Sequence, residues 1–246
     1  MIPFFRKLRQ RFLGQRQVTR YLAYALGEIV LVVIGILIAL RVNNWNEERQ
    51  ERNQAAKFLM ALREDLSRDT LLLRKTLEWG VKDSTLLGQM RRALSADDVT
   101  RDTLVALARY RFNPWTHLGV SFNNNTYVSL QATGALNSIP EDLRNTLQEL
   151  NTLQLDYTRQ CEADENLYLN QTILYGNNYP FNDIGHIAPD SHLADMIWAA
   201  AGFEQLASAF NALIGVKYSN YYAHLPELEH LLAKTREILK RLDAPK

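Results

Sequence analysis

The chain has 246 residues, of which 28 are Lys or Arg and 27 are Asp or Glu, for a formal net charge of +1. This balance argues against a globally basic nucleic-acid binder, so we expect no nucleic-acid partner. A single Cys excludes an intramolecular disulfide and every zinc or iron–sulfur site built from several cysteines. With 11 Gly and 7 Pro the chain is poor in turn-forming residues, which predicts long regular elements.

The N-terminal region combines a basic head with a long apolar stretch. Residues 1–20 carry Lys and Arg but no acidic residue, and residues 21–40, YLAYALGEIVLVVIGILIAL, contain Glu28 as their one charged side chain. About twenty helical residues rise about 30 Å, which is the thickness of the hydrocarbon core of a bilayer. We therefore predict one transmembrane helix over residues 21–42, with Tyr21 and Tyr24 at one membrane interface and Trp45 at the other.

Other interpretations of this region remain open. A buried core helix is rarely apolar on every face. A cleaved signal peptide has a shorter apolar region and small residues before its cleavage site, whereas Leu40 and Arg41 follow Ala39 here. A retained span is therefore favoured. Residues 2–13 predict either an interfacial amphipathic helix on an anionic leaflet or a solvated basic tail.

The distribution of charge predicts the topology. Cations precede the span, and acidic residues outnumber basic ones after it, so residues 1–20 are expected in the cytoplasm and the body outside it. Residues 43–55 are polar and contain neither Gly nor Pro, which predicts a helical stalk. We expect residues 56–246 to form one extracytoplasmic all-α domain, a helical bundle large enough to bury its own core.

Apolar residues at three- and four-residue spacing predict an amphipathic helix from the stalk to about Trp79, and Gly80 is expected to end or bend it. Ser138 and Glu141 have the spacing of a capping box, which predicts the start of another long helix. Irregular loops are expected over 110–126 and 176–190. The helices predicted after Gly80 cover residues 84–94, 98–109, 126–133, about 141–175, 191–200, 203–222 and 226–242.

Glu28 is the sharpest single feature of the predicted span. A carboxyl group in hydrocarbon is costly when ionised, so an intramembrane acid is a functional hypothesis by default. It could contact a neighbouring helix or a partner subunit, snorkel toward the headgroups, or relay protons. Small residues near one stripe of the same helix allow helices to approach closely, and they are Ala23, Gly27, Gly35 and Ala39. Besides the lipid bilayer, we therefore expect a homo-oligomer or another membrane protein as partner.

Candidate binding residues in the body lie on the two predicted loops, where irregular backbone presents aromatic and polar groups. They are Trp115, Asn123, Asn124, Asn125, Tyr179 and Phe181. A metal site is a weaker hypothesis, because no His pair has the i, i+4 spacing of a helical metal motif. Its ligands would come from Asp183, His186, Asp190, His192 and Asp195. We expect no catalytic residue and no cofactor, with His224 and His230 on the surface of the last helix and Cys161 as a buried apolar residue.

The run YLAYALGEIVLVVIGILIALRVNNWNEERQ is similar to the span and stalk of a family of uncharacterised single-span bacterial membrane proteins. Residues 122–150, which include NNNTYVSLQATGALNSIPEDLRNTLQEL, resemble a second signature of that family. Val128 and Gln131 depart from the more polar or basic residues of that signature. The family has no established activity. The resemblance implies an inner-membrane anchor with an extracytoplasmic, and hence periplasmic, helical domain.

These features predict a membrane-anchored interaction or scaffold protein of the bacterial cell envelope. It would associate through its transmembrane helix and bind a protein or envelope component with its helical domain. The alternative is an extracytoplasmic sensor of a small ligand. Because residues 1–20 leave no room for a signalling domain, such a sensor would need a partner to carry its signal. An envelope enzyme is the least favoured prediction.

Overall fold

The computed structural model describes residues 16–182, 188 and 190–243, and of residues 16–21 and 23 it describes the backbone alone. The described residues form six α-helices and no strand, which confirms the all-α prediction. The basic residues before Arg16, and with them the helix or tail predicted over 2–13, lie outside this range. The chain divides into two compact units, Met1–Ala56 and Lys57–Lys246.

The first unit consists of the N-terminal part of helix α2 (Arg16–Leu94). Among the described residues, α2 is the one helix whose length and composition would allow it to cross a membrane. None of its apolar window is buried inside the chain. The core helix of a soluble protein is mostly buried, so this window is not part of a core formed by the described chain.

The part of α2 that belongs to the second unit continues to Leu94, so Gly80 does not end the helix, which was one of the two predicted outcomes. A Cβ atom at Gly80 would lie 2.7 Å from Cδ2 of Leu225 and 3.6 Å from the ring of Tyr221. Gly80 therefore permits close approach of another helix rather than ending its own. Leu87 and Met90 extend the buried face of α2 past this point.

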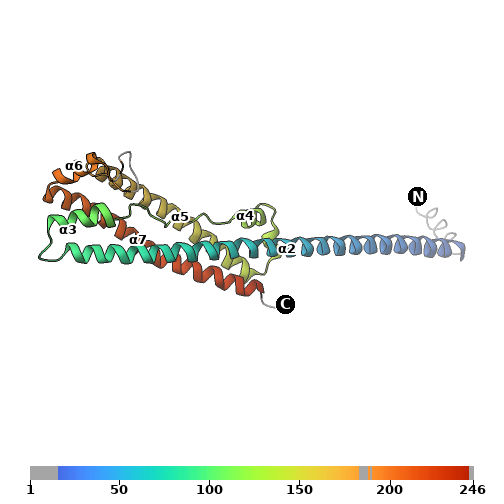
Figure 1. Cartoon of the computed structure of the whole chain (residues 1–246). Coiled ribbons are helices and arrows are strands. Elements are labelled where there is room, and N and C mark those ends of the chain that lie inside the picture. Colours follow the sequence, from blue (N-terminus) through green and yellow to red (C-terminus); the bar gives the residue numbers. More distant parts are fainter. Residues whose placement is uncertain (1–15, 183–187, 189, 244–246) are drawn as a thin grey trace, which may run out of the picture. The chain divides into compact units, whose positions relative to one another are not determined.

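The second unit is built around three long helices (Figure 1). Arg63 of α2 contacts Asp243, and Asp83 of α2 contacts Lys217, so α2 and α7 run antiparallel. Helix α5 is also antiparallel to α7 (Figure 1). Besides the second part of α2, the long helices are α5 (Glu141–Gly176) and α7 (Phe203–Asp243).

The core between these helices is rich in leucine. Along each helix these leucines recur at the three- and four-residue spacing that predicted amphipathic helices from the sequence. Burying each of these side chains contributes about 1.5–3 kcal/mol relative to leaving it exposed. The buried leucines include Leu62, Leu66, Leu73 and Leu77 of α2, Leu143, Leu147 and Leu150 of α5, and Leu206, Leu213, Leu228 and Leu231 of α7.

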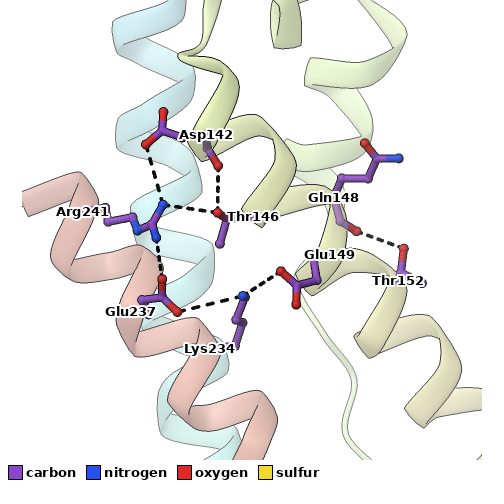
Figure 2. A network of polar contacts seen from close by, with 8 residues as sticks. All are labelled: Asp142, Thr146, Gln148, Glu149, Thr152, Lys234, Glu237 and Arg241. Atoms are coloured by element: carbon purple, nitrogen blue, oxygen red, sulfur yellow. Dashed lines mark hydrogen bonds and ion pairs between the residues drawn. The ribbon is translucent and has the colours of Figure 1, made fainter.

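Polar contacts join the beginning of α5 to the end of α7 (Figure 2). Nζ of Lys234 lies 2.7 Å from the Glu149 carboxylate, and the Arg241 guanidinium lies 2.6 Å from the Glu237 carboxylate and 3.7 Å from that of Asp142. Ion pairs this exposed contribute about 0–1 kcal/mol each. The leucine core is therefore the main source of cohesion between α5 and α7.

The short elements cover the ends of the bundle. Arg101 of α3 donates to the carbonyl oxygens of Trp198, Ala199 and Ala201 at 2.8–3.0 Å, which satisfies acceptors left open at the C-terminal end of α6. Helices α3 and α6 thus lie together at one end of the bundle (Figure 1). The short elements are α3 (Arg101–Ala106), the π-helix η1 (Leu107–Arg111), α4 (Asn125–Ala132), the 3-10 helix η2 (Ala135–Ser138) and α6 (His192–Ala200).

Most of the helices predicted after Gly80 are present, with several differences. The predicted helix 84–94 is the end of α2, and the predicted helix 98–109 is divided between α3 and the π-helix η1. Helix α7 continues through Pro226 instead of starting again there, because buried side chains such as Tyr221 and Leu228 hold it against the core on both sides of the proline. The predicted capping box does not form. Ser138 ends the 3-10 helix, and Pro140 takes the N-cap position of α5 without a side-chain cap bond.

Candidate functional site

Residues 112–124 connect η1 to α4 without regular secondary structure, and we call them the connecting segment. Their side chains alternate in burial, as in extended backbone, where successive side chains point to opposite sides. One side therefore faces the core and the other faces solvent. Phe112, Pro114, Leu118 and Val120 are buried, whereas Trp115, His117, Gly119 and Ser121 are exposed.

Buried polar side chains of the three long helices bind the backbone of the connecting segment. Buried backbone groups outside helices and sheets need such partners, because an unpaired one costs as much as a lost hydrogen bond. Lys217 donates to the carbonyl oxygen of Asn113, Tyr168 to that of Pro114 at 2.7 Å and Tyr157 to that of Leu118 at 2.6 Å, while Asp69 accepts from the N–H of Asn123 at 2.9 Å. The segment is thus fixed at intervals along its length.

Lys217 is fully buried, and its ammonium group lies 2.7 Å from Oδ2 of Asp83. The hydroxyl of Tyr221 donates to the same carboxylate oxygen at 2.7 Å. Burial lowers the pKa of Lys217, and the charge and hydrogen bond of Asp83 oppose that shift. The side chains of Asp83, Lys217 and Tyr221 therefore join α2 to α7 at the start of the connecting segment.

Asp69 of α2 is fully buried beneath the other end of the segment. Its Oδ1 accepts from the backbone N–H of Asn123 at 2.9 Å and from Nδ2 of Asn123 at 2.7 Å, and its Oδ2 accepts from Nε2 of Gln154 at 3.3 Å. Burial raises the pKa of Asp69, the hydrogen bonds from Asn123 and Gln154 lower it in part, and the charge of Asp65 raises it. Asn123 therefore has a structural role that the sequence did not indicate.

The exposed side of the segment borders two grooves. The first, which we call the Trp115 groove, has a volume of about 400 Å³ and lies between the segment and α5. Its largest apolar side chains, Trp115 and Leu169, are 52% and 54% exposed. The groove is lined by Pro114, Trp115, Thr116, Glu162, Glu165, Asn166, Tyr168, Leu169 and Thr172.

The second groove, the His117 groove, has a volume of about 540 Å³ and reaches α2. The ring of His117 stacks on that of Trp79, with centroids 5.3 Å apart, and Nζ of Lys82 lies 5.5 Å from the centroid of Trp79. Glu165 lines both grooves, which makes them neighbours. The lining residues of the second groove are Lys75, Thr76, Trp79, Thr116, His117, Gly119 and Glu165.

The structure separates the residues predicted on the two loops. Trp115 lies in a groove, Asn124 precedes α4 at its N-cap position without a side-chain cap bond, and Asn125 is exposed as the first residue of α4. Tyr179 and Phe181, which were predicted as possible binding residues, are each 7% exposed and pack into the interior. Aromatic side chains on irregular backbone serve equally well as core when other aromatic rings lie within reach.

Those rings come from both ends of the second loop and from the connecting segment. Tyr179 stacks on Trp198 with centroids 5.7 Å apart, and the centroid of Phe181 lies 5.1 Å from that of Tyr175. Phe112 and Phe181 are also neighbours, at 6.4 Å. Aromatic pairs in this distance range contribute about 0.5–1.5 kcal/mol beyond their buried area. Tyr179 and Phe181 of the second loop are therefore part of the core.

In the predicted span, Tyr24, Gly27, Glu28, Gly35 and Ala39 are exposed within the chain. A Cβ atom at Gly27 or Gly35 would meet no other atom within 4 Å. Trp45, beyond the span, is exposed, with the Arg49 guanidinium 5.8 Å from its ring centroid. The side chains of Tyr21 and Ala23 lie outside the described part of the chain.

The predicted metal ligands are only partly described. Asp183 and His186 lie outside the described residues. Asp195 contacts the buried Arg109 guanidinium at 2.7 Å, so its carboxylate serves an ion pair. Within residues 16–182, 188 and 190–243, no three His, Cys, Asp or Glu side chains are grouped closely enough to hold a metal ion.

Two further groups of the bundle bear on its chemistry. His224 is fully buried, not on the surface as predicted, and its Nε2 lies 2.9 Å from Oδ2 of Asp164. His224 follows Asn220 by four residues and Lys217 by seven, so all three lie on one buried face of α7. This helical spacing could have predicted the burial of His224 from the sequence. Cys161 is buried as expected, and burial raises the pKa of its thiol to about 12, which makes it a poor nucleophile.

Comparison with known proteins gives one match. The model of a family described as a family of unknown function, DUF6090, matches residues 28–150, half of the chain. This range contains α2 from Glu28 onward, Asp69 and Asp83, the whole connecting segment and the beginning of α5. No curated protein and no solved structure matches the chain.

Proposed function

The chain belongs to the DUF6090 family, whose function is unknown, and from its own geometry we propose that it is a membrane-anchored interaction protein of the bacterial cell envelope. In this proposal α2 is retained as an anchor in the inner membrane. The head remains in the cytoplasm, and the helical domain binds a protein or envelope component outside it. Binding rather than catalysis is the proposed role.

The proposal of an anchor is supported by the exposure of the apolar part of α2. Large apolar side chains such as Leu31 and Leu37 are 73% and 59% exposed within the chain. Exposing this apolar surface to water would cost free energy of about 25 cal/mol per Å². Lipid removes that cost, because hydrocarbon requires only apolar side chains and satisfied backbone hydrogen bonds, which a helix provides. The excess of Lys and Arg before the span supports a cytoplasmic head.

The observation that carries the proposed binding role is the way the connecting segment is fixed. Lys217, Tyr168, Tyr157 and Asp69 all bind its backbone, and the outward side chains take no part in these contacts. An exposed Trp115 is thereby held on irregular but supported backbone, so a partner loses little conformational entropy in using it. Preorganised aromatic side chains of this kind are typical of the centres of protein interfaces.

The proposed association through the span involves Glu28 and the small residues of α2. Gly27 and Gly35 leave open space that a second helix can approach, and Ala39 continues the same region. A carboxyl group at Glu28 gains from a hydrogen bond in hydrocarbon, which an adjacent helix can supply. The proposed partner is a second copy of this chain or another membrane protein.

The experiment uses the full-length chain in membranes. Carbonate extraction should leave the chain in the membrane fraction, and a C-terminal reporter that works only outside the cytoplasm should be active. A photo-crosslinking residue at position 115 should give a protein adduct, whereas the same residue at Asp97, exposed in a turn remote in sequence from the connecting segment, should not. Release by carbonate, an inactive reporter or the absence of any adduct at position 115 would contradict the corresponding part of the proposal.

A further inference from the structure

The Trp115 groove differs from the His117 groove in charge. Two carboxylates, those of Glu162 and Glu165, line the Trp115 groove, and none of its lining residues is a Lys or an Arg. The His117 groove includes Lys75 beside Glu165. The Trp115 groove is therefore the more acidic of the two neighbours.

The two carboxylates of the Trp115 groove are not paired with a cation. Within the described part of the chain, neither Glu162 nor Glu165 forms an ion pair, and Lys75, which lines the neighbouring groove together with Glu165, forms none with it. They are three residues apart on α5, and like charges at this helical spacing repel each other. A cation placed between them would relieve that repulsion.

Apolar surface lies directly beside this charge. Trp115 and Leu169 are each more than half exposed in the groove. A Lys or Arg side chain carries an apolar stem below its charged group, so it matches a groove that offers both surfaces at once. An indole ring also attracts a cation over its face. Phosphate groups of nucleic acids or anionic lipids would instead be repelled by the carboxylates.

We propose that the Trp115 groove binds a basic segment of a partner protein, with a Lys or Arg side chain placed between Trp115 and the carboxylates of Glu162 and Glu165. This inference rests on the proposed function, because it names the chemistry of the partner that the domain binds. The apolar stem of the bound side chain packs on Trp115 and Leu169. Its charged end meets the carboxylates, which an Arg guanidinium can contact through two parallel hydrogen bonds.

The test places a photo-crosslinking residue at Leu169 in the full-length chain in the membranes of the cells that produce it. Crosslinked peptides are identified by mass spectrometry. The expected partner peptide contains Lys or Arg at or beside the crosslinked position. Its yield should fall about tenfold in the Glu162→Gln/Glu165→Gln variant, since loss of an opposing charge at a close interfacial pair weakens binding several-fold.

The matched control is the Asp97→Asn/Glu229→Gln variant. It removes the same number of charges from two exposed positions that form no ion pair in the described structure. Its yield should equal that of the parent chain, and both variants should unfold at the parent's temperature. High salt should reduce the yield of the parent more than that of the Glu162→Gln/Glu165→Gln variant.

The outcomes separate this inference from the function on which it rests. A protein adduct whose peptide lacks basic residues, or whose yield is the same in both variants, overturns the inference and leaves the interaction role standing. An adduct to a lipid or to a small cation such as a polyamine at Leu169 also overturns it. The absence of a protein adduct at both Leu169 and position 115 would remove the proposed interaction role as well.

Discussion

The ammonium group of Lys217 lies 2.7 Å from the Asp83 carboxylate inside the helical domain, where Lys217 has no exposed surface. The same ammonium group donates to the backbone of Asn113. One buried side chain on α7 thus joins a charge on α2 to the start of the connecting segment. The integrity of the exposed surface around Trp115 depends on this contact.

Removing the carboxylate should destabilise the domain strongly. Asp83→Asn leaves the Lys217 ammonium buried without its counter-charge, and breaking a buried pair in this way costs about 3–5 kcal/mol. Burial already lowers the folded-state pKa of Lys217 below its ordinary value of 10.5. At any pH between the folded-state pKa and 10.5, the folded variant therefore binds fewer protons than the unfolded variant. Its stability should therefore rise as the pH increases toward 10.5. Thermal unfolding of the full-length chain in detergent micelles measures both effects, and Asp97→Asn is the control. Equal stability of the parent and Asp83→Asn would contradict the assigned role.

Asp69 should give the chain an acid-side pH dependence. Its folded-state pKa is raised above the ordinary value of 3.8, mainly by burial. The stabilising contribution of the protonated group is therefore complete below pH 3.8 and is lost as the pH rises through the folded-state pKa. Asp69→Asn cannot titrate, so the stability of the parent relative to this variant should fall as the pH is raised across that window. Unfolding curves at a series of pH values test this, and a pH-independent difference would refute it.

Gly80 and Gly88 offer a matched pair on one helix. Replacing a helical Gly by Ala where the added methyl group has room stabilises by about 0.5–1 kcal/mol, and a Cβ atom at the half-buried Gly88 would meet its nearest neighbour, Arg92, only at 4.0 Å. We expect Gly88→Ala to stabilise. At Gly80 the added atom would lie 2.7 Å from Leu225, so Gly80→Ala should destabilise by about 1–3 kcal/mol. The Leu225→Ala background should remove that penalty. If Gly80→Ala still destabilises the domain in the Leu225→Ala background, the strain does not arise from contact with Leu225.

The thiol of Cys161 should react slowly in the folded chain. Its side chain is 2% exposed, and burial raises its pKa to about 12. At neutral pH this leaves about a thousandfold less thiolate than in a free cysteine. Maleimide labelling followed by mass spectrometry should therefore be at least about a hundredfold slower in buffer than in denaturant. An exposed thiol in the Asp97→Cys variant is the internal standard, and comparable rates for the two thiols would show that the site opens readily.

Glu28→Leu tests the proposed association of the span. The substitution should preserve membrane integration, because Leu is favourable in hydrocarbon, while it reduces crosslinked oligomers or co-purified membrane partners several-fold. Val33→Leu, at an exposed position on another face of the same helix, is the control and should leave association unchanged. Undiminished association in Glu28→Leu would remove the carboxyl group from the contact.

The sequence predicted the features that depend on periodicity. Leu62, Leu66 and Leu73 recur at helical spacing, and all three are buried. Helix α4 ends within a residue of the predicted position 133, and Gly134 follows its C-cap in the left-handed conformation that glycine favours, with φ of 72°. These features follow from local rules that a single stretch of residues satisfies by itself.

Features that depend on contacts distant in the sequence were missed. Nothing in the residues around Gly80 reveals that Leu225 packs there, and the polarity of Asp69 and Lys217 gives no sign that the connecting segment covers them. The burial of Tyr179 and Phe181 was not predicted, because the ring of Trp198, which stacks on Tyr179, is contributed by a later helix. Of the residues that line the Trp115 groove, the sequence predicted only Trp115 as a binding residue. Glu162 and Leu169 lie on α5, which is distant in the sequence from the connecting segment.

The polar contacts between the helices and the connecting segment do not involve its outward side chains. In three of the four contacts a helix side chain donates to a main-chain carbonyl oxygen of the segment. In the fourth, a main-chain N–H of the segment donates to Asp69. The outward positions, at residues 115, 117, 119 and 121, are therefore decoupled from the interior. Their identities can be exchanged together, in a randomised library or in the course of divergence, to create new binding specificities on an unchanged scaffold.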